Sequence, residues 1–431
     1  MKWKSHGISL CLLASTVLIS CSKHKDEQAP VVIIHGPGNL SSYQLPASIP
    51  VDVEIRDDQS IEEFSISIYN SQGETAFREI WQPGQKEIRE TFSCAVNGLY
   101  LSSGTYTLKV SASDGVNSSS AYGQLQLIEI PKALEAIHVL CYGQSNPEIF
   151  RLDNGTFIFE KSIPHAIKSA YISNASHQIA VHPVSGFPVQ AFHTSTFGDA
   201  FQLLYQNIGA TEYFQSMNYS GEETALWVAF GNQQMRAYNG EGNIENTISQ
   251  PANRVTKKMI AGGRTLLCDE ENTSNGNHYL SAYNLNTGLT FFSTSISGEV
   301  MDGRLCTNGK FILFINENTT SAVYEFDPDQ SILSLKHNLA SGRVLELTAI
   351  DFDLSCLAHE NGILLYSYQN NISGFFNNSI QIQHIAFDPV NEEIHTGNNK
   401  SYSVIDYTNG AILQQYTCSD TIRKILLEFN K

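Results

Sequence analysis

The 431-residue sequence predicts an all-β protein built from two folded domains. Three observations lead to this class. Apolar and polar residues alternate along short runs, turn-forming residues separate those runs, and a pattern of about forty residues recurs through the C-terminal part of the chain. Alternation with a period of two places one side of a strand in a core and the other in water. Hydrophobic residues make up 42% of the chain, which is enough for a large core and excludes wholesale disorder.

The charge balance bears on the kind of partner. The chain has 43 Asp and Glu residues against 26 Lys and Arg residues, so its formal net charge is −17. A protein that binds nucleic acid needs a basic footprint for the phosphates. We therefore expect no nucleic-acid partner.

Residues 1–20 have the features of an export signal peptide. Lys2 and Lys4 precede a mostly apolar stretch, Ile8–Ile19, which is shorter than the ~20 residues that a membrane-spanning helix needs. The stretch ends in Leu18-Ile19-Ser20-Cys21, which resembles a bacterial lipobox. That resemblance implies that Cys21 is lipidated and becomes the N-terminus. The alternative is an ordinary signal peptide with a chance cysteine.

Residues 21–30 are polar and aperiodic, which is typical of a flexible tether. Within them, Lys25-Asp26-Glu27 loosely resembles the signals that follow the cysteine in some Gram-negative lipoproteins bound for the outer cell surface. The resemblance implies a protein of the cell outer membrane, anchored through the lipid on Cys21 and exposed at the surface. The alternative is a protein that faces the periplasm.

Residues 31–130 carry the alternating pattern most clearly. Apolar side chains recur at every second position in Tyr106–Val110, and Asp114-Gly115 is a typical turn signal. About seven strands in ~100 residues suit a β-sandwich. The run from Gly104 to Gly115 resembles the late strand of bacterial Ig-like and PKD-type surface modules. This implies an Ig-like β-sandwich and says almost nothing about function.

Residues 134–431 contain an internal repeat. Each unit has an apolar or aromatic strand, a turn of Asn, Asp and Gly, and another apolar strand. The last turn residues fall near positions 155, 198, 240, 288, 330, 371 and 410, at intervals of 39–48 residues. Seven near-equal units, each long enough for four strands, predict a seven-bladed β-propeller.

The last unit also carries a family resemblance. Ala386-Phe387-Asp388-Pro389 and the run from Val404 to Gly410 resemble YVTN-type and quinoprotein-like propeller repeats, which implies the fold and leaves the chemistry open.

One strand is left over after the seventh unit, Ile422–Phe429, whereas the first unit begins with Ile137–Cys141 as its apparent second strand. Placed as the missing inner strand, the C-terminal strand closes the ring and removes an open edge. The alternative is an open stack with a frayed tail.

The sequence contains none of the common catalytic or metal motifs. There is no G-x-S-x-G, no H-E-x-x-H, no G-x-x-x-x-G-K and no C-x-x-C. We therefore expect no catalytic residue, no metal site and no cofactor. The propeller cysteines lie mostly in apolar strands, which is typical of small buried hydrophobic residues. Cys141 and Cys418 both fall near the ring closure, where a disulfide between them is the alternative.

Propeller geometry predicts a site on the rim where the inner strands begin. The polar residues expected there are Lys258, Asp302, Arg304, Glu346, Gln383, His384 and Arg423, with Lys257, Glu299 and Lys424 in a wider set. Tyr213 precedes the third inner strand, where it would either stack on a sugar or peptide or belong to the core.

Rigid rings with variable loops suit recognition. We therefore expect a membrane-anchored binding module for an envelope protein or glycan. One alternative is a polysaccharide-active enzyme that uses rim carboxylates such as Asp302 and Glu346, which come from neighbouring blades. The other is a scaffold subunit of an envelope complex.

Overall fold

The computed structural model describes residues 28–431 apart from 72, 74, 99–100, 143–145, 185, 207–212 and 221–223. The expected signal peptide, Cys21 and most of the expected tether lie outside the described residues. The chain divides into two compact units, Met1–Pro131 and Lys132–Lys431. The described residues form strands β1 to β36 and no α-helix, so none of them belongs to a helix able to cross a membrane.

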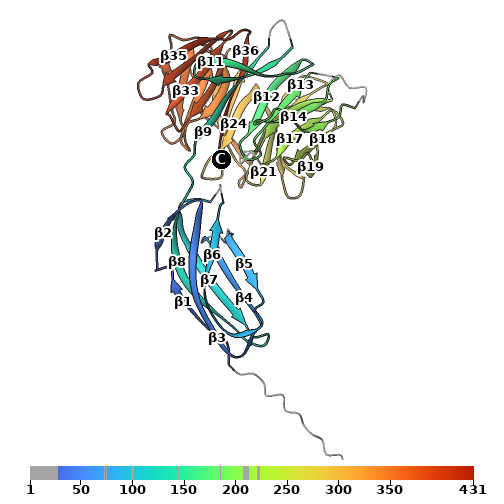
Figure 1. The fold of residues 1–431 in the computed structure, drawn as a ribbon. Helices are drawn as coiled ribbons and strands as arrows, with labels where there is room; N and C mark the ends of the chain where they lie inside the picture. Colours follow the sequence, from blue (N-terminus) through green and yellow to red (C-terminus); the bar gives the residue numbers. More distant parts are fainter. Residues whose placement is uncertain are drawn as a thin grey trace, which may run out of the picture. The chain divides into compact units, whose positions relative to one another are not determined.

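The first unit is made of two sheets around one core (Figure 1). The sheets have the orders β1-β3-β6 and β2-β8-β7-β4-β5. Alternation works as predicted in β7, where Tyr106, Leu108 and Val110 point into the core and are at most 1% exposed. The strands are β1 (Val31–Gly36), β2 (Ser41–Gln44), β3 (Ala47–Ile61), β4 (Glu63–Tyr69), β5 (Thr75–Trp81), β6 (Gln85–Val96), β7 (Gly104–Ser113) and β8 (Ser118–Ile128).

The described residues of the second unit form seven four-stranded antiparallel sheets. Six of them use consecutive strands: β12 (Ile167–Ser173), β13 (Gln178–Pro183), β14 (Val189–His193) and β15 (Asp199–Leu203); β16 (Phe214–Tyr219), β17 (Leu226–Phe230), β18 (Gln234–Tyr238) and β19 (Ile244–Ser249); β20 (Arg254–Gly262), β21 (Thr265–Asn272), β22 (His278–Asn284) and β23 (Thr290–Ile296); β24 (Glu299–Leu305), β25 (Phe311–Glu317), β26 (Thr320–Asp327) and β27 (Ile332–Asn338); β28 (Val344–Ala349), β29 (Leu354–His359), β30 (Gly362–Ser367) and β31 (Ile372–Asn377); β32 (His384–Asp388), β33 (Glu393–Asn398), β34 (Ser401–Asp406) and β35 (Ile412–Thr417).

Burial explains why these sheets stand side by side. The second strand is wholly buried in the sheets that contain β13 and β17, whereas the outermost strand β35 is almost wholly exposed. Each core cluster joins two neighbouring sheets; one of them packs Trp227 of β17 against Met259 of β20. A four-stranded sheet with two apolar faces needs a neighbour on both sides, and a ring of sheets supplies it.

The seventh sheet joins the two ends of this unit. It has the order β11-β10-β9-β36, with β9 (Leu134–Cys141), β10 (Glu148–Asp153), β11 (Thr156–Ser162) and β36 (Ile422–Phe429). The C-terminal strand pairs antiparallel with β9, with Ile422 opposite Cys141 (Figure 1). This is the pairing that the leftover strand predicted. The innermost strand of each sheet, called its first strand here, also contacts the first strand of the next sheet. Strand β36 is the first strand of the seventh sheet and contacts both β32 and β12, so the circle of first strands is closed.

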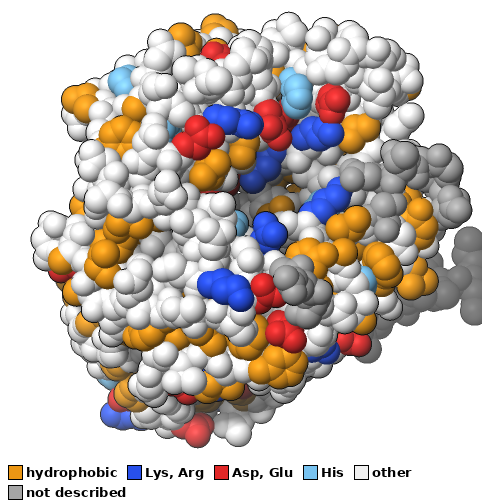
Figure 2. Space-filling model, turned by 90° about the horizontal axis from the view of Figure 1, so that it is seen from above, with side chains coloured by type: hydrophobic (Ala, Val, Ile, Leu, Met, Phe, Trp, Pro, Cys, Tyr) orange, Lys and Arg blue, Asp and Glu red, His pale blue; other side chains and the backbone are white. Residues whose placement is uncertain are grey.

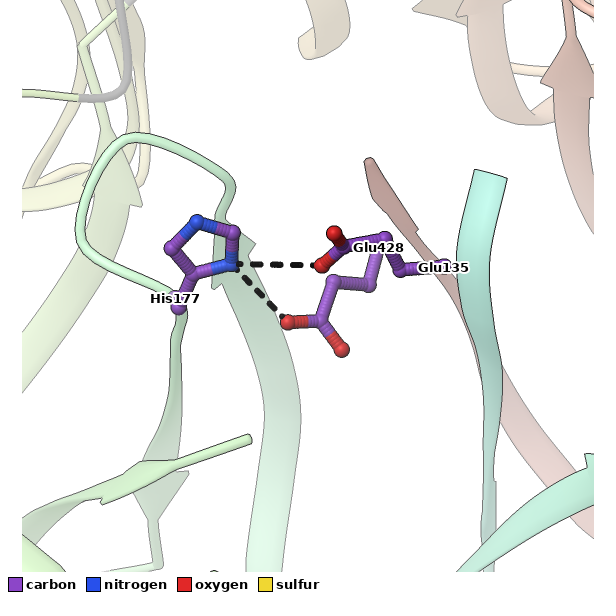
Figure 3. A group of neighbouring side chains, drawn as sticks. All are labelled: Glu135, His177 and Glu428. Carbon is purple, nitrogen blue, oxygen red and sulfur yellow. Dashed lines mark hydrogen bonds and ion pairs between the residues drawn. The ribbon is translucent and has the colours of Figure 1, made fainter. Parts of the chain in front are cut away.

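A buried carboxylate on the closing strand adds side-chain hydrogen bonds to the backbone pairing with β9. Glu428 of β36 accepts hydrogen bonds from His138 Nε2 at 2.9 Å, His177 Nδ1 at 3.1 Å and Thr194 Oγ1 at 2.5 Å. Figure 3 shows that His177 faces the carboxylates of both Glu428 and Glu135, and the Glu135 carboxylate lies 3.9 Å from His177 Nδ1. Burial raises the pKa of Glu428, but the hydrogen bonds from His138, Thr194 and His177 outweigh it and bring the pKa to about 2. The carboxylate therefore ties β36 to its own sheet and to the next one.

Replacing Glu428 with Gln should destabilise the protein most at neutral pH and progressively less as the pH falls below 4.5. Because folding lowers the pKa of Glu428, its contribution is complete above its ordinary pKa of 4.5 and is lost as the pH falls toward about 2. We expect a loss of about 1.5–3 kcal/mol at neutral pH, which is typical of hydrogen bonds to a charged group. Thermal unfolding of both proteins between neutral pH and about pH 3 measures the difference.

Glu135→Gln is the matched control, because Glu135 contacts the same histidine but is about half exposed. It should change the unfolding temperature little at any pH. A difference between wild type and Glu428→Gln that stays constant with pH would contradict the assignment of the carboxylate.

Candidate functional site

The first strands of the ring enclose a central channel. A cavity of about 380 Å³ in it is lined from β12, β16, β28, β32 and β36. Figure 2 looks onto one face of the molecule and shows Lys and Arg side chains gathered around a central hollow. In a chain with a net charge of −17, basic side chains concentrated at one hollow mark it as a candidate site.

Three of the predicted residues, Glu346, His384 and Lys424, form one charged cluster. Glu346 of β28 lies 3.1 Å from His384 Nδ1 of β32 and in contact with the Lys424 ammonium of β36. The same carboxylate accepts the backbone N–H of Ile385 at 3.1 Å. Burial raises the pKa of Glu346, but Lys424 and His384 outweigh it and hold the pKa at about 2. Burial lowers the pKa of Lys424, and Glu346 more than compensates, so the pKa is raised. Both groups are therefore charged at neutral pH.

A second ion pair joins β20 and β24, which are the first strands of two neighbouring sheets. Lys258 of β20 lies 3.3 Å from Asp302 of β24, and both side chains are mostly buried. The two carboxylates that sequence analysis offered as an acid–base pair, Asp302 and Glu346, thus each face a lysine of their own. The structure brings these predicted residues together as ion pairs between the first strands of different sheets.

The other predicted residues lie apart from these pairs. Gln383 is exposed and directly precedes β32. Arg423 is exposed, and its Nε donates to the carbonyl of Tyr142 at 3.2 Å. Tyr213 is only 3% exposed and packs against Phe230 with ring centroids 5.3 Å apart. It belongs to the core, which is the second of the two interpretations that the sequence left open, and we remove it from the candidate site.

Arg304 lines a separate and larger cavity of about 640 Å³ near the ends of β16, β20 and β24. Other lining residues are Asn218, Tyr219, Ser220, Trp227 and Asn246, of which the first three also line the channel cavity. The Arg304 Nη1 group donates to the carbonyl of Asp351, whereas Nε and Nη2 have no hydrogen-bond partner among the described residues. Both of these nitrogens are buried, and the guanidinium adds a positive charge to the lining of the cavity.

Two groups among the described residues have the composition of metal ligands. They are Glu135, His177 and Glu428, and Asp388, Glu393 and His395, with ligand atoms within 4.8 Å of one another in each group. Hydrogen bonds account for their central members. Glu428 already accepts three bonds, and Asp388 accepts from Val390 N and Asn391 Nδ2. We therefore assign both groups structural roles.

Sequence reasoning missed the cavity beside Arg304 and the contacts of Glu428. Asn218, Trp227 and Asn246 come from β16, β17 and β19, and no local pattern links them. The only signal for Glu428 was its place in the apolar run of β36, where an acidic residue stands between Leu427 and Phe429.

No protein-family model matches the sequence, and no curated protein matches it. Among solved structures, a quinoprotein alcohol dehydrogenase-like protein of Bacteroides thetaiotaomicron is similar over 92% of this chain and 99% of that one, with 11% identity and a TM-score of 0.50. The Swd1 β-propeller domain of Myceliophteria thermophila is similar over 62% of this chain and 91% of that one, with 10% identity and a TM-score of 0.46. At such identity the first likeness speaks for the fold alone. The chain is an all-β protein whose repeated four-stranded sheets form a β-propeller.

Proposed function

We propose that this protein is a lipid-anchored binding module of the cell envelope, in which a seven-bladed propeller holds a protein or glycan partner. The observation that carries the proposal is the closed ring, whose charged channel adjoins a cavity of about 640 Å³. Ligand sites commonly measure about 300–1,000 Å³ and combine apolar walls with a few polar groups. Trp227, Leu305 and Arg304 provide that combination.

Seven blades are the interpretation that the seven four-stranded sheets support. We also propose that the first unit is an Ig-like spacer. It has one sheet of three strands and one of five, in which most neighbouring strands are antiparallel, and the two sheets share one core. This arrangement is compatible with that class. Its role in the proposal is to hold the propeller away from the membrane.

The proposed anchor rests on the lipobox-like Leu18–Cys21. More than one acyl chain gives durable attachment where a single chain does not. We place the protein at the outer membrane, with surface exposure favoured by Lys25-Asp26-Glu27.

Binding is favoured over catalysis by the state of the channel carboxylates. A glycosidase needs one carboxylic acid that stays protonated near its working pH. Glu346 has a pKa of about 2 and is paired with Lys424, and Asp302 is paired with Lys258. Charged groups held in this way suit the recognition of a polar partner better than proton transfer.

Replacing Cys21 with Ser should release the protein from the membrane. Without the thiol, no thioether to a lipid forms, and the chain loses its proposed attachment. Cell fractionation and metabolic labelling with a clickable fatty acid should place wild type in the membrane fraction with label, and Cys21→Ser in the soluble fraction without it. Cys94→Ser, which removes a buried cysteine, is the control and should keep the label. Unlabelled wild type would refute the anchor.

Replacing Arg304 with Gln should weaken the capture of the partner. An oxygen-rich group in the cavity would be attracted by the positive charge of the Arg304 guanidinium, and a charge-assisted contact of this kind contributes about 1.5–3 kcal/mol, so affinity should fall about 10- to 100-fold. Residues 22–431 are immobilised and exposed to envelope proteins and to a glycan array, and the retained partner is titrated against each variant.

Arg264→Gln is the matched control, because Arg264 is exposed and does not line this cavity. The substitution therefore removes the same charge from a place outside the cavity. It should bind as wild type does. Retention that is equal for all three proteins would refute binding at this cavity. Turnover of a glycan in place of retention would refute the binding function itself.

A further inference from the structure

We propose that Cys141 and Cys418 form a disulfide that locks the propeller ring. The two sulfur atoms lie 2.6 Å apart. That is closer than the ~3.5–4.0 Å of an ordinary contact between smaller carbon atoms. Of the six cysteines in the described part of the chain, these are the two whose sulfurs touch each other.

The backbone fixes both residues at the ring closure. Cys141 ends β9 and lies opposite Ile422, the first residue of the closing strand. Cys418 directly follows β35, and its N–H donates to the carbonyl of Lys400 at 2.8 Å. Tyr142 N–H donates to the carbonyl of Thr421 at 2.8 Å, so the segment between the two sheets is held on both sides. The pairing thus follows from the register of β36 and needs no movement of either strand.

The surroundings of the two thiols differ in a way that suits disulfide exchange. The hydrogen bond from the Cys141 thiol, assisted by the backbone of Asp420 and Ser419, lowers the pKa of Cys418 to about 7 against the effect of burial. The hydrogen bond to Cys418, together with burial, raises the pKa of Cys141. Cys418 is therefore the thiolate that reacts first, because the thiolate is the nucleophile in this chemistry.

The reaction is a two-step exchange with a dithiol–disulfide oxidant. The Cys418 thiolate attacks one sulfur of the oxidant's disulfide, which forms a mixed disulfide and releases one thiolate of the oxidant. Cys141, after loss of its proton, attacks the Cys418 sulfur and releases the second thiolate. Both protein thiols are oxidised and the oxidant's disulfide is reduced to a dithiol, whose two protons come from Cys141 and, through the solvent, from Cys418.

Burial sets when this exchange happens. Cys141 and Cys418 are 1% and 2% exposed and belong to the core cluster that contains Ile422 and Ile425 of β36. An oxidant reaches them before β36 docks or when it detaches. Once formed, the bond should resist reductants as long as the ring stays closed.

The bond would link residues 277 positions apart in sequence and enclose every sheet between β9 and β36. Cross-links that close long loops restrict the unfolded chain most in the entropic account. The inference rests on the proposed export for its place in the cell, because disulfides persist in oxidising compartments. Its chemistry is tested without reference to the cell.

The test uses residues 22–431 refolded from denaturant in a glutathione redox buffer, then unfolded, alkylated and digested for mass spectrometry. We expect four alkylated cysteines out of six and one cross-linked peptide pair that contains Cys141 and Cys418. Native protein should keep the bond in a reductant that removes it from unfolded protein. Oxidised protein should unfold roughly 5–10 °C above reduced protein.

Variants separate the bond from packing effects. Cys418→Ser should leave five free thiols and remove the dependence of the unfolding temperature on reductant, whereas the control Cys306→Ser should keep the cross-link. Six free thiols in folded wild type would overturn the inference, even if neither variant folds. If wild type had six free thiols but still captured a partner, the proposed function would stand without the disulfide. If wild type had the cross-link but captured no partner, the disulfide would be supported and the proposed function refuted.

Discussion

The structure of the second unit depends on β36 pairing with β9. Without β36, the sheet of β9, β10 and β11 would expose its inner edge to the channel, and the faces of two neighbouring sheets would lose part of their cover. Antiparallel pairing from Leu134 to Cys141 satisfies that edge along its length. The two ends of the unit therefore share one sheet, and opening the ring means breaking a complete row of backbone hydrogen bonds.

The same strand supplies groups to both the closure and the channel. Lys424 near its start pairs with Glu346, which lies two first strands away in the ring because β32 stands between them. Glu428 near its end pairs with His138 in its own sheet and with His177 in the next. The channel charges are thus positioned by the element that closes the ring, and a change that loosens β36 alters the site together with the stability.

Sequence patterns predicted the parts of this architecture that are local. Alternation gave the strands, turn residues gave their spacing, and the leftover Ile422–Phe429 identified the closing strand. The candidate residues were placed on the correct strands, but their partners were not predicted, because Lys258 and Asp302 meet across a gap of more than forty positions. Tyr213 could not be assigned from the sequence, because an aromatic residue next to a strand is equally compatible with a core and with a binding surface. Its burial in the structure assigns it to the core. The cavity beside Arg304 gathers residues from several strand ends and leaves no local signature.

The proposed binding function explains the charges in the channel better than a stabilising role does. Removing a lysine and a glutamate from water costs several kcal/mol per ion, and apolar side chains of similar volume would often stabilise a protein at least as well. The ring already has its cores between the sheets, where Trp227, Met259 and their counterparts supply the stabilisation. Glu346 and Lys424 instead line the space that the sheets leave open, where their pairing keeps the wall polar and fixed in position. In the proposed function, fixed polar walls discriminate among polar partners, because a partner group that does not match their hydrogen bonds loses its hydration and gains no bond in exchange.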